Sequence, residues 1–552
     1  MKKTVLKNMG LVVAVVLLSG CVSSESGDCS ETMAKAANPL KIGWAKRSIV
    51  SDKPVPIAGQ FHLRVSQGVY TPVLASAMVM EKDGDAAVFV SADMVSVHPA
   101  ILVAVKNILK NEVPGLPVEK IIINATHTHA GPSDRDESEN YPNKVKFTPS
   151  NEMRSFISRQ IADAVKEAWQ NRAAGSISYG YGFATTGHSR RTIYLDDTGK
   201  RDQAQAGIAM NGHGKMYGKT NDDMFDGYEA GTDAFINILY SFDKTGKLTG
   251  AIINVPCPAQ TSEGAWMLHA SFWYNVREKL EAKYGGIGII CQSAAAGDLA
   301  PRQMHYQEAE KRRYRLKYAD KIAAYMKKTM KYPKAWIKTP EAAAKRYERD
   351  TVELMRAEDI ANRIVAAFDE VLAWAGKEKM SKPELKHEVR TLKLARRMFP
   401  AELVAEEEAK RDEVMKEEFL KDGEAYEMLI KNSRLNRRRN RIGGVSKRAA
   451  IQDKEPFITT DIHVVKVGNV AFASNCFELF MDYMHRIQAR SPFEQTFIVQ
   501  LTVDENDNVS YLATGRAIAN KGYSATPYCN LVSPEGGQQL VNETIKALKE
   551  IR

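Results

Sequence analysis

Two histidines separated by a single residue are the sharpest chemical feature of this sequence. They are His127 and His129, within the run Asn-Ala-Thr-His-Thr-His-Ala-Gly-Pro at 124–132. Side chains two positions apart point to the same side of an extended chain, and Gly-Pro then turns the chain. Imidazole binds zinc at about 2.0–2.1 Å, so one histidine could hold a metal while the other faces a substrate. The alternative is a pair of polar loop histidines with no ligand.

Three further segments carry polar residues of suitable chemistry in order along the chain. They are Gly297-Asp298-Leu299-Ala300-Pro301, then Ala473-Ser474-Asn475-Cys476-Phe477-Glu478, and then Tyr511 followed by Thr514 and Tyr523. Together with the histidine run, they resemble the neutral/alkaline (non-lysosomal) ceramidase family. The matching family segments are Gly-Asp-x-Ser-Pro, a metal-binding glutamate at the start of a helix, and Tyr-x-x-Thr with a second tyrosine beyond it. The resemblance extends from about Ile42 to the C-terminus and is least clear in the central part.

The resemblance implies a Zn²⁺ site. By it, His127, Glu478 and Tyr511 are carried over as zinc ligands. An imidazole, a carboxylate and a phenol so far apart in sequence must then meet around one cation, and the hydrolase interpretation depends on that meeting.

The resemblance also implies residues that act on the substrate. His129 is carried over as a substrate-facing residue that could shuttle a proton, and Tyr523 as a hydrogen-bond donor near the metal. Arg190 matches an active-site arginine of the family, in a register that Arg191 could also satisfy. Taken alone, each of these tyrosines and arginines is better explained as a structural hydrogen-bonding residue.

The sequence departs from the family at its second ligand histidine. That histidine lies in a segment of the form Asn-x-x-x-His-Pro, whereas here Asn254 is followed by Pro258 at the histidine position. Proline offers no side-chain donor, so the site has three protein ligands or another residue substitutes in a rearranged loop. The candidates are Cys257, Gln260, Glu263 and His269; of these, Cys257 should point to the face opposite position 258.

The second departure is Ala300, which stands where the family has a serine proposed to act as nucleophile or to assist catalysis. A methyl group can do neither, and Ser293 is distant along the chain. Metal chemistry avoids the serine, because zinc lowers the pKa of bound water to about 7 and polarises a carbonyl. Tyrosine or arginine donors would stabilise the oxyanion, and His129 would protonate the leaving group.

Two functional hypotheses follow. The first is a ceramidase-like, metal-dependent hydrolase of N-acyl (amide) or ester bonds in an N-acylated sphingolipid or an N- or O-acylated sugar. The second is a catalytically degenerate binding lipoprotein with a ceramidase-like fold. A basic run at 432–448, with three consecutive arginines at 437–439, is better explained as a solvated surface than as a nucleic-acid site. We therefore expect no nucleic-acid partner.

The N-terminus resembles that of a bacterial lipoprotein. Lysines at positions 2, 3 and 7 precede an apolar run at 11–18 that is too short to span a bilayer, and Leu18-Ser19-Gly20-Cys21 resembles a lipobox. We expect cleavage of the signal peptide 1–20, lipid attachment at Cys21 and a flexible tether over 21–40. The protein would then be lipid-anchored and extracytoplasmic in the cell envelope, on the outer membrane of a Gram-negative cell. The alternative is an ordinary signal peptide with a nearby cysteine.

The elements that must position these residues alternate in type. Apolar patterning predicts strands at 86–91, 120–123, 248–255 and 286–291 and a helix at 100–109. Each of the last two strands runs into a polar loop, where sites in α/β sheets tend to lie. We therefore expect an α/β fold of mixed α+β layers.

The central part of the chain has a different character. From 305 to 454 it is charged and mostly helical, with Ile364, Phe368, Val371 and Leu372 spaced as one apolar helix face. This predicts a ceramidase-like catalytic domain in two parts, 41–304 and 455–552, separated by a helical insertion at 305–454. Because the chain ends soon after Tyr523, we expect no C-terminal immunoglobulin-like domain of the kind found in longer family members.

Composition sets few further limits. The formal net charge of +10 at pH 7 favours anionic neighbours such as phospholipid headgroups or acidic glycans. The cysteines lie far apart and do not suggest a disulfide framework, so Cys257, Cys291 and Cys476 are expected to be buried thiols.

Overall fold

The core of the protein is an eight-stranded sheet of order β14-β13-β12-β7-β1-β4-β5-β6. The computed structural model describes residues 38–135, 140–201, 212–327 and 330–552. The strands of this sheet are β1 (Lys41–Ser48), β4 (Leu74–Lys82), β5 (Asp85–Ala92), β6 (Ile121–Ala125), β7 (Ala173–Phe183), β12 (Phe235–Asp243), β13 (Leu248–Val255) and β14 (Gly288–Ser293). The pairs β5–β6 and β13–β14 are parallel, and the other neighbours are antiparallel.

Four helices cover one face of this sheet. They are α1 (Pro99–Glu112), α2 (Ser150–Gln170), α3 (Phe272–Tyr284) and α6 (Pro340–Ala375). Alternate strand residues such as Val88 and Val90 pack under α1 and α2, while Ile238 and Ile253 pack under α3 and α6. Because side chains alternate between the two faces of a strand, the residues between them form a second apolar face.

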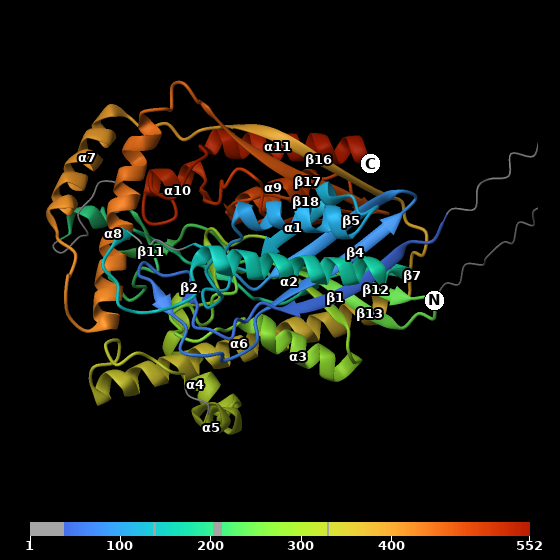
Figure 1. Ribbon diagram of the computed structural model, residues 1–552, viewed down its shortest axis with the longest axis horizontal. Coiled ribbons are helices and arrows are strands. Elements are labelled where there is room, and N and C mark those ends of the chain that lie inside the picture. Colours follow the sequence, from blue (N-terminus) through green and yellow to red (C-terminus); the bar gives the residue numbers. More distant parts are fainter. Residues whose placement is uncertain (1–37, 136–139, 202–211, 328–329) are drawn as a thin grey trace, which may run out of the picture. The chain divides into compact units, whose positions relative to one another are not determined.

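A smaller sheet packs on that second face. Its strands are β16 (Leu385–Ala395), β17 (Phe457–Val467), β18 (Val470–Ser474) and β20 (Gln495–Val499). Phe472 of this sheet lies 4.7 Å from Phe89 of the large sheet, measured between ring centroids. The far face of the small sheet is covered by α9 (Met481–Arg490) and α11 (Pro534–Ile551). The layers therefore run helix, sheet, sheet, helix, as can be followed in Figure 1.

The large sheet is curved, so that its two ends approach each other. The edge strand β14 contacts β4, β5 and β6, and the Asn124 side chain donates to the carbonyl of Cys291 at 3.0 Å. Arg277 of α3 forms a fully buried two-nitrogen ion pair with Asp93, which follows β5, at 2.6 and 2.9 Å. The loops that follow β6, β13 and β14 consequently meet.

The remaining elements are short or lie in the helical part of the chain. The helices are α4 (Gln307–Lys317), α5 (Ala319–Lys327), α7 (Ala401–Lys416), α8 (Ala425–Ala449) and α10 (Gly515–Asn520), with 3₁₀ turns at Val118–Lys120, Thr198–Lys200 and Met304–Tyr306. The strands are β2 (Pro56–Ile57), β3 (Arg64–Val65), β8 (His188–Ser189), β9 (Arg191–Tyr194), β10 (Gly214–Met216), β11 (Phe225–Tyr228), β15 (Leu299–Ala300), β19 (Glu478–Leu479) and β21 (Tyr511–Leu512).

The predicted α/β class and most predicted elements are confirmed. β5, β6, β13, β14 and α1 lie where the apolar patterns placed strands and a helix, with shifts of a few residues at their ends. Cys257, Cys291 and Cys476 are buried free thiols. The range 305–454 is mainly helical, and Ile364, Phe368 and Val371 are fully buried. It also contains β16, which pairs with β17 along its whole length.

The beginning of the folded part differs from the prediction. Leu40, expected in the tether, is fully buried, and its N–H donates to the carbonyl of Ser381 at 2.9 Å. The signal peptide, Cys21 and nearly all of the tether fall outside the described residues. Among the residues that are described, no helix is long and apolar enough to cross a membrane.

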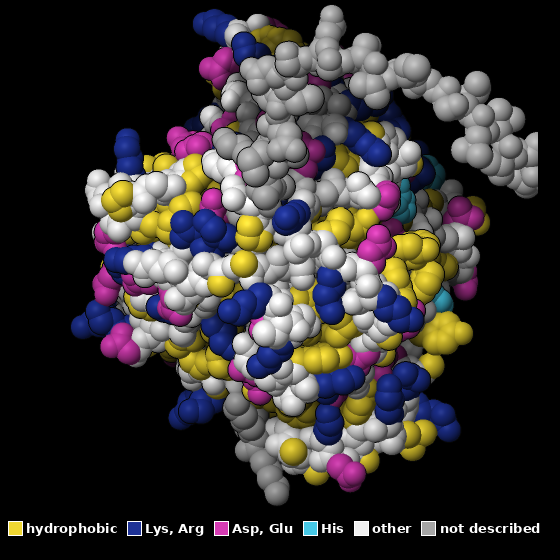
Figure 2. Space-filling view, turned by 90° about the vertical axis from the view of Figure 1, so that its right-hand side faces the viewer, with side chains coloured by type: hydrophobic (Ala, Val, Ile, Leu, Met, Phe, Trp, Pro, Cys, Tyr) yellow, Lys and Arg dark blue, Asp and Glu magenta, His cyan; other side chains and the backbone are white. Residues whose placement is uncertain are grey.

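Charged side chains on the face drawn in Figure 2 are mixed in sign. Lys and Arg side chains (dark blue) are scattered among acidic, polar and apolar ones rather than gathered in a single patch. On that face, the net positive charge is therefore spread out.

Candidate active site

His127 lies just beyond β6 and is held in a strained backbone conformation. Its φ of +62° is in the left-handed region that non-glycine residues rarely adopt. Its Nδ1 lies 2.7 Å from the carbonyl oxygen of Val95. A carbonyl oxygen can only accept, so Nδ1 carries a proton, and Nε2 is the ring nitrogen that faces the site. This is the arrangement commonly found in metal-binding histidines.

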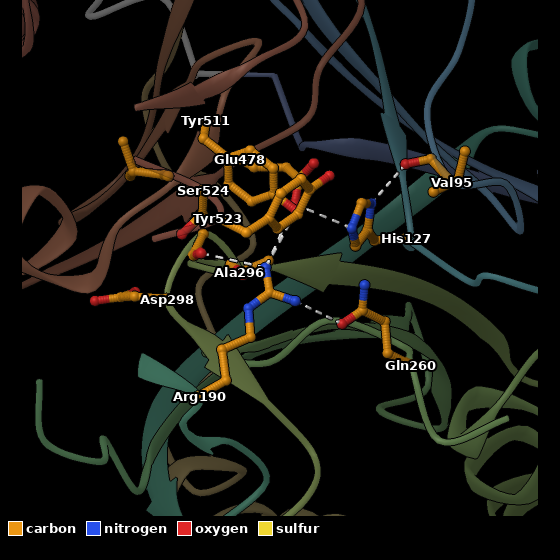
Figure 3. Close-up of polar contacts among 12 residues, drawn as sticks. Val95, His127, Arg190, Gln260, Ala296, Asp298, Glu478, Tyr511, Tyr523 and Ser524 are labelled. Carbon is orange, nitrogen blue, oxygen red and sulfur yellow. Dashed lines mark hydrogen bonds and ion pairs between the residues drawn. The ribbon is translucent and has the colours of Figure 1, made fainter. Parts of the chain in front are cut away.

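Glu478 and Tyr511 are brought together by the pairing of two short strands. β19 and β21 are parallel, and Glu478 is the register partner of Tyr511. Glu478 Oε2 lies 3.3 Å from His127 Nε2, and Figure 3 shows the imidazole between Val95 and this carboxylate. Burial acts to raise the pKa of Glu478, but His127 and Arg190 outweigh it and hold that pKa below its usual value.

Arg190 is the centre of the hydrogen-bond network around these residues. It projects from the turn between β8 and β9, where its own N–H is held by the carbonyl of Asp298 at 2.9 Å. Its side chain is 2% exposed. One guanidinium nitrogen donates to Gln260 Oε1 at 3.0 Å, and the other lies 3.4 Å from the Tyr511 hydroxyl and 3.6 Å from Glu478 Oε2. Burial acts to lower the pKa of Arg190. The oxygens of Tyr511, Tyr217 and Glu478 outweigh burial and raise that pKa above its usual value.

Gln260 connects Arg190 to His129 and fixes the protonation of His129. Arginine only donates, so the amide oxygen of Gln260 faces Arg190 and its NH₂ faces His129 Nε2. His129 Nε2 is therefore an acceptor, and its proton lies on Nδ1, which is 3.8 Å from Glu263 Oε2. Burial, then His127, Arg64 and Arg190, lower the pKa of His129 well below its usual value.

The donor atoms at the centre of the site fit a small cation. His127 Nε2 and Glu478 Oε2 lie 3.3 Å apart, and Oε2 is buried. Two facing acceptors repel unless a proton or a metal ion lies between them. Within the described ranges, no group of three or more His, Cys, Asp or Glu side chains is arranged to hold a metal. The set that fits has one imidazole, one carboxylate and the Tyr511 phenol.

Tyr523 borders this set on the outer side. Its ring lies 5.7 Å from that of Tyr511 and 5.5 Å from that of Phe61, both in edge-to-face arrangements. Burial raises the pKa of Tyr523, so its hydroxyl remains a donor at neutral pH. The structure thus brings His127, His129, Arg190, Glu478, Tyr511 and Tyr523 into one neighbourhood; their roles as ligands or catalytic groups stay predictions.

The residues considered as replacements for the missing histidine have different surroundings. The Cys257 thiol donates to the carbonyl of Thr186 at 3.1 Å within an apolar cluster, facing away from the site as expected. His269 bonds to Thr71 at 3.0 Å. Gln260 and Glu263 both lie beside His129. The polar neighbour that the Pro258 segment contributes to the site is therefore Gln260.

Ser293 does not replace the serine that is missing at Ala300. Ala300 pairs with His188 in the short β15–β8 ladder. Ser293 donates to the carbonyl of Cys257 at 2.9 Å and accepts from Gln500 at 2.9 Å, so its hydroxyl is used structurally.

The sequence left two points about the site unresolved, and the structure decides both. Arg190 rather than Arg191 faces Glu478, because Arg191 forms a buried ion pair with Glu229. The sequence offers Gln260 as a possible metal ligand, whereas in the structure its side chain bridges Arg190 and His129.

Two other polar residues of the site had no signal in the sequence. Tyr217 contacts Arg190 at 3.3 Å. Arg64 is fully buried and donates to the carbonyl of His129 at 2.6 Å.

Comparisons with known proteins give a consistent answer for the fold. No protein-family model matches the sequence, and no curated protein matches it. Among solved structures, a ceramidase complexed with C2 superposes with a TM-score of 0.58 at 15% identity, covering 93% of this chain and 76% of that one. The neutral ceramidase from Pseudomonas aeruginosa gives a TM-score of 0.59 at 15% identity, covering 93% of this chain and 75% of that one. The chain therefore has the neutral ceramidase fold, as its four dispersed motifs predicted.

Proposed function

We propose that this protein is a metal-dependent hydrolase of N-acyl amide or ester bonds. The observation that carries the proposal is the 3.3 Å approach of His127 Nε2 to Glu478 Oε2 beside a buried arginine, an arrangement that a cation between the two atoms would satisfy. The likeness to two solved structures that are named as ceramidases supports a hydrolase of this class. The substrate class is an N-acylated sphingolipid or an N- or O-acylated sugar outside the cytoplasm.

His127, Glu478 and Tyr511 would hold the metal. A bound Zn²⁺ ion would lower the pKa of water to about 7 and polarise the acyl carbonyl. Arg190 places a permanent positive charge beside Glu478, where negative charge would develop in a tetrahedral intermediate. The Tyr523 hydroxyl, which keeps its proton, would be a hydrogen-bond donor on the outer side of the site.

His129 is suited to move the proton. Its lowered pKa keeps the ring neutral at pH 7, so Nε2 can accept a proton from the attacking water and return it to the leaving amine or alcohol. Gln260 donates to that lone pair in the structure, so its amide must turn aside before the proton is accepted. This route needs no serine, which accommodates Ala300.

We also propose that the N-terminal segment is a lipoprotein signal peptide and that Cys21 carries a lipid anchor. The support is the lipobox-like run that precedes Cys21. The protein would then meet its substrate at the surface of a membrane. Loss of membrane association in Cys21→Ala, with the native leader retained, is the expected result, and unchanged association would refute the anchor.

A catalytically silent binding protein remains the competing hypothesis, favoured by Ala300 and by the missing histidine. Metal content distinguishes the two, because a degenerate site would lose affinity for metal together with activity. The protein as purified is expected to bind about one Zn²⁺ per chain. His127→Ala and Glu478→Gln are each expected to weaken Zn²⁺ binding at least about tenfold.

The experiment measures metal content by mass spectrometry and release of fatty acid from a panel of N-acyl and O-acyl compounds. Removal of metal with a chelator should abolish turnover, and Zn²⁺ should restore it. His305→Ala is the matched control, because His305 is exposed and lies outside the site. Absence of stoichiometric metal, together with unchanged turnover in His127→Ala, would exclude the proposal.

A further inference from the structure

Arg441 of α8 occupies an unusual position among aromatic rings. Its guanidinium carbon lies 4.9 Å from the ring centroid of Phe61, 5.3 Å from that of Tyr523 and 5.4 Å from that of Tyr528. Aromatic faces attract a guanidinium, but they do not accept hydrogen bonds along its edges. The N–H groups at the edge of this half-buried guanidinium must therefore donate to acceptors other than these rings.

The other half-buried arginines of α8 have such acceptors. Arg437, Arg439 and Arg448 each donate to main-chain carbonyl oxygens. By contrast, the polar contact of Arg441 is the sulfur of Cys529, at 3.7 Å. Among the described residues, no carboxylate lies within ion-pair distance of Arg441. The described residues supply this half-buried guanidinium with no oxygen acceptor, so its N–H groups stay available to a ligand.

Arg441 also borders the candidate active site on two sides. Tyr523 lies between it and Tyr511, whose hydroxyl contacts Arg190. Phe61 belongs to the same loop as Gly59, and a Cβ on Gly59 would lie only 2.5 Å from the His129 ring. Phe61 is 49% exposed, so the loop next to Arg441 is open to solvent.

Three arginines, Arg64, Arg434 and Arg437, lie around this loop, and the Glu263 carboxylate lies on its side nearest His129. Arg437 donates to the carbonyl of Gln60, and Arg64 is buried beneath the same loop. The pKa of His62 is lowered to about 3 by burial first and then by Arg64, Arg434 and Arg437. Such a field disfavours a cationic substrate and favours an anionic one.

We propose that Arg441 binds an anionic group of the substrate, so that the acyl amides or esters cleaved here carry a carboxylate, phosphate or sulfate in addition to the acyl bond. This inference rests on the proposed hydrolase function and narrows it. The planar guanidinium can donate two parallel hydrogen bonds to such a group. Tyr523 then separates the anion from the acyl bond, so the two must be joined by a spacer in the substrate.

The test uses matched amides that differ only in charge. The probes are N-octanoyl-aminohexanol, its phosphate monoester, and N-octanoyl-aminohexanoate, together with versions that have shorter spacers. Octanoate release gives kcat and KM, and calorimetry with the same compounds gives binding affinity. The proteins are the wild type, Arg441→Gln, Arg441→Lys and the control Arg438→Gln, whose arginine is exposed and pairs with Glu417.

The wild type is expected to prefer the anionic probes at least about tenfold, mainly through a lower KM. That ratio should fall toward one in Arg441→Gln, be partly kept in Arg441→Lys and be unchanged in Arg438→Gln. Thermal melting and circular dichroism verify that the variants are folded.

The two proposals can fail separately. If no probe is cleaved but anionic probes still bind more tightly through Arg441, the hydrolase proposal is wrong for this bond type and the anion site stands. If amides are cleaved or bound with the same charge preference in wild type and Arg441→Gln, the anion site is refuted. A preference for the neutral probe would refute it as well.

Discussion

At the scale of single residues, the protonation of the site follows from which atoms can only accept or only donate. Val95 fixes the tautomer of His127, and Arg190 fixes the orientation of Gln260 and hence the tautomer of His129. The contacts themselves place these protons, because a carbonyl oxygen never donates and a guanidinium never accepts. The site is therefore preorganised, with the Nε2 atoms of both histidines directed inward.

Gln260 is expected to be the most sensitive residue outside the ligand set. Gln260→Leu removes one acceptor of Arg190 and the donor to His129 Nε2, so the free energy of unfolding should fall by about 1–3 kcal/mol and turnover should fall with it. Gln260→Glu keeps the acceptor for Arg190 and loses only the donor to His129, so its cost should be smaller. Chemical denaturation and turnover assays measure both effects. Equal, negligible effects of the two substitutions would contradict the bridging role.

At the scale of elements, the loop after β14 supports the segment that carries Glu478. Asp298 Oδ1 accepts the N–H of Met481, the first residue of α9, at 3.0 Å. The loop thus caps α9 from outside, satisfying a helix N–H that has no partner within the helix. Because α9 begins directly after β19, this cap also holds the strand that presents Glu478.

Burial of the Asp298 carboxyl makes stability depend on pH in a definite direction. Burial raises the pKa of Asp298 to about 6 from an ordinary value of 3.8. A raised carboxyl pKa means that the folded state binds the proton more tightly than the unfolded state does. This contribution to stability is complete below pH 3.8 and is lost as the pH rises through about 6.

Asp298→Asn keeps the acceptor but cannot ionise. Relative to wild type, it should therefore gain stability between about pH 4 and pH 7, by up to about 3 kcal/mol. Unfolding curves of the two proteins at a series of pH values measure the difference. A difference that is constant across this range would show that Asp298 does not titrate as described.

At the scale of the whole folded part, curvature of the large sheet is what assembles the site. The loops after β6, β13 and β14 come from opposite ends of the strand order, and they meet because β14 reaches back to β4, β5 and β6. The Asp93–Arg277 pair spans this closure and is fully buried at Asp93.

Removing one partner of that ion pair should strongly reduce the free energy of unfolding. Arg277→Ala leaves the Asp93 carboxylate buried without its cation, and the expected loss in free energy of unfolding is about 3–5 kcal/mol. The control is Arg159→Ala, which breaks a half-exposed ion pair with Glu112 and should cost at most about 1 kcal/mol. Denaturant titration compares the two variants. Similar small losses in both would mean that the closure does not depend on the buried pair.

The sequence alone predicted those parts of the fold that depend on local patterns of residues. Continuous apolar runs predicted β5 and β13, an apolar helix face predicted the buried side of α6, and four dispersed motifs predicted the ceramidase fold. These features depend on side-chain periodicity and on short runs of residues, both of which are visible in one dimension.

Only the tertiary structure decided which polar side chains meet. It selected Arg190 over Arg191, assigned Gln260 as a bridge and placed Arg441 of a distant helix beside Tyr523. Each of these contacts joins residues that are neighbours only because a curved sheet closes and two short strands pair in one register. A single-residue change in such a register would turn every side chain to the opposite face, and the sequence pattern does not determine that register between segments hundreds of residues apart.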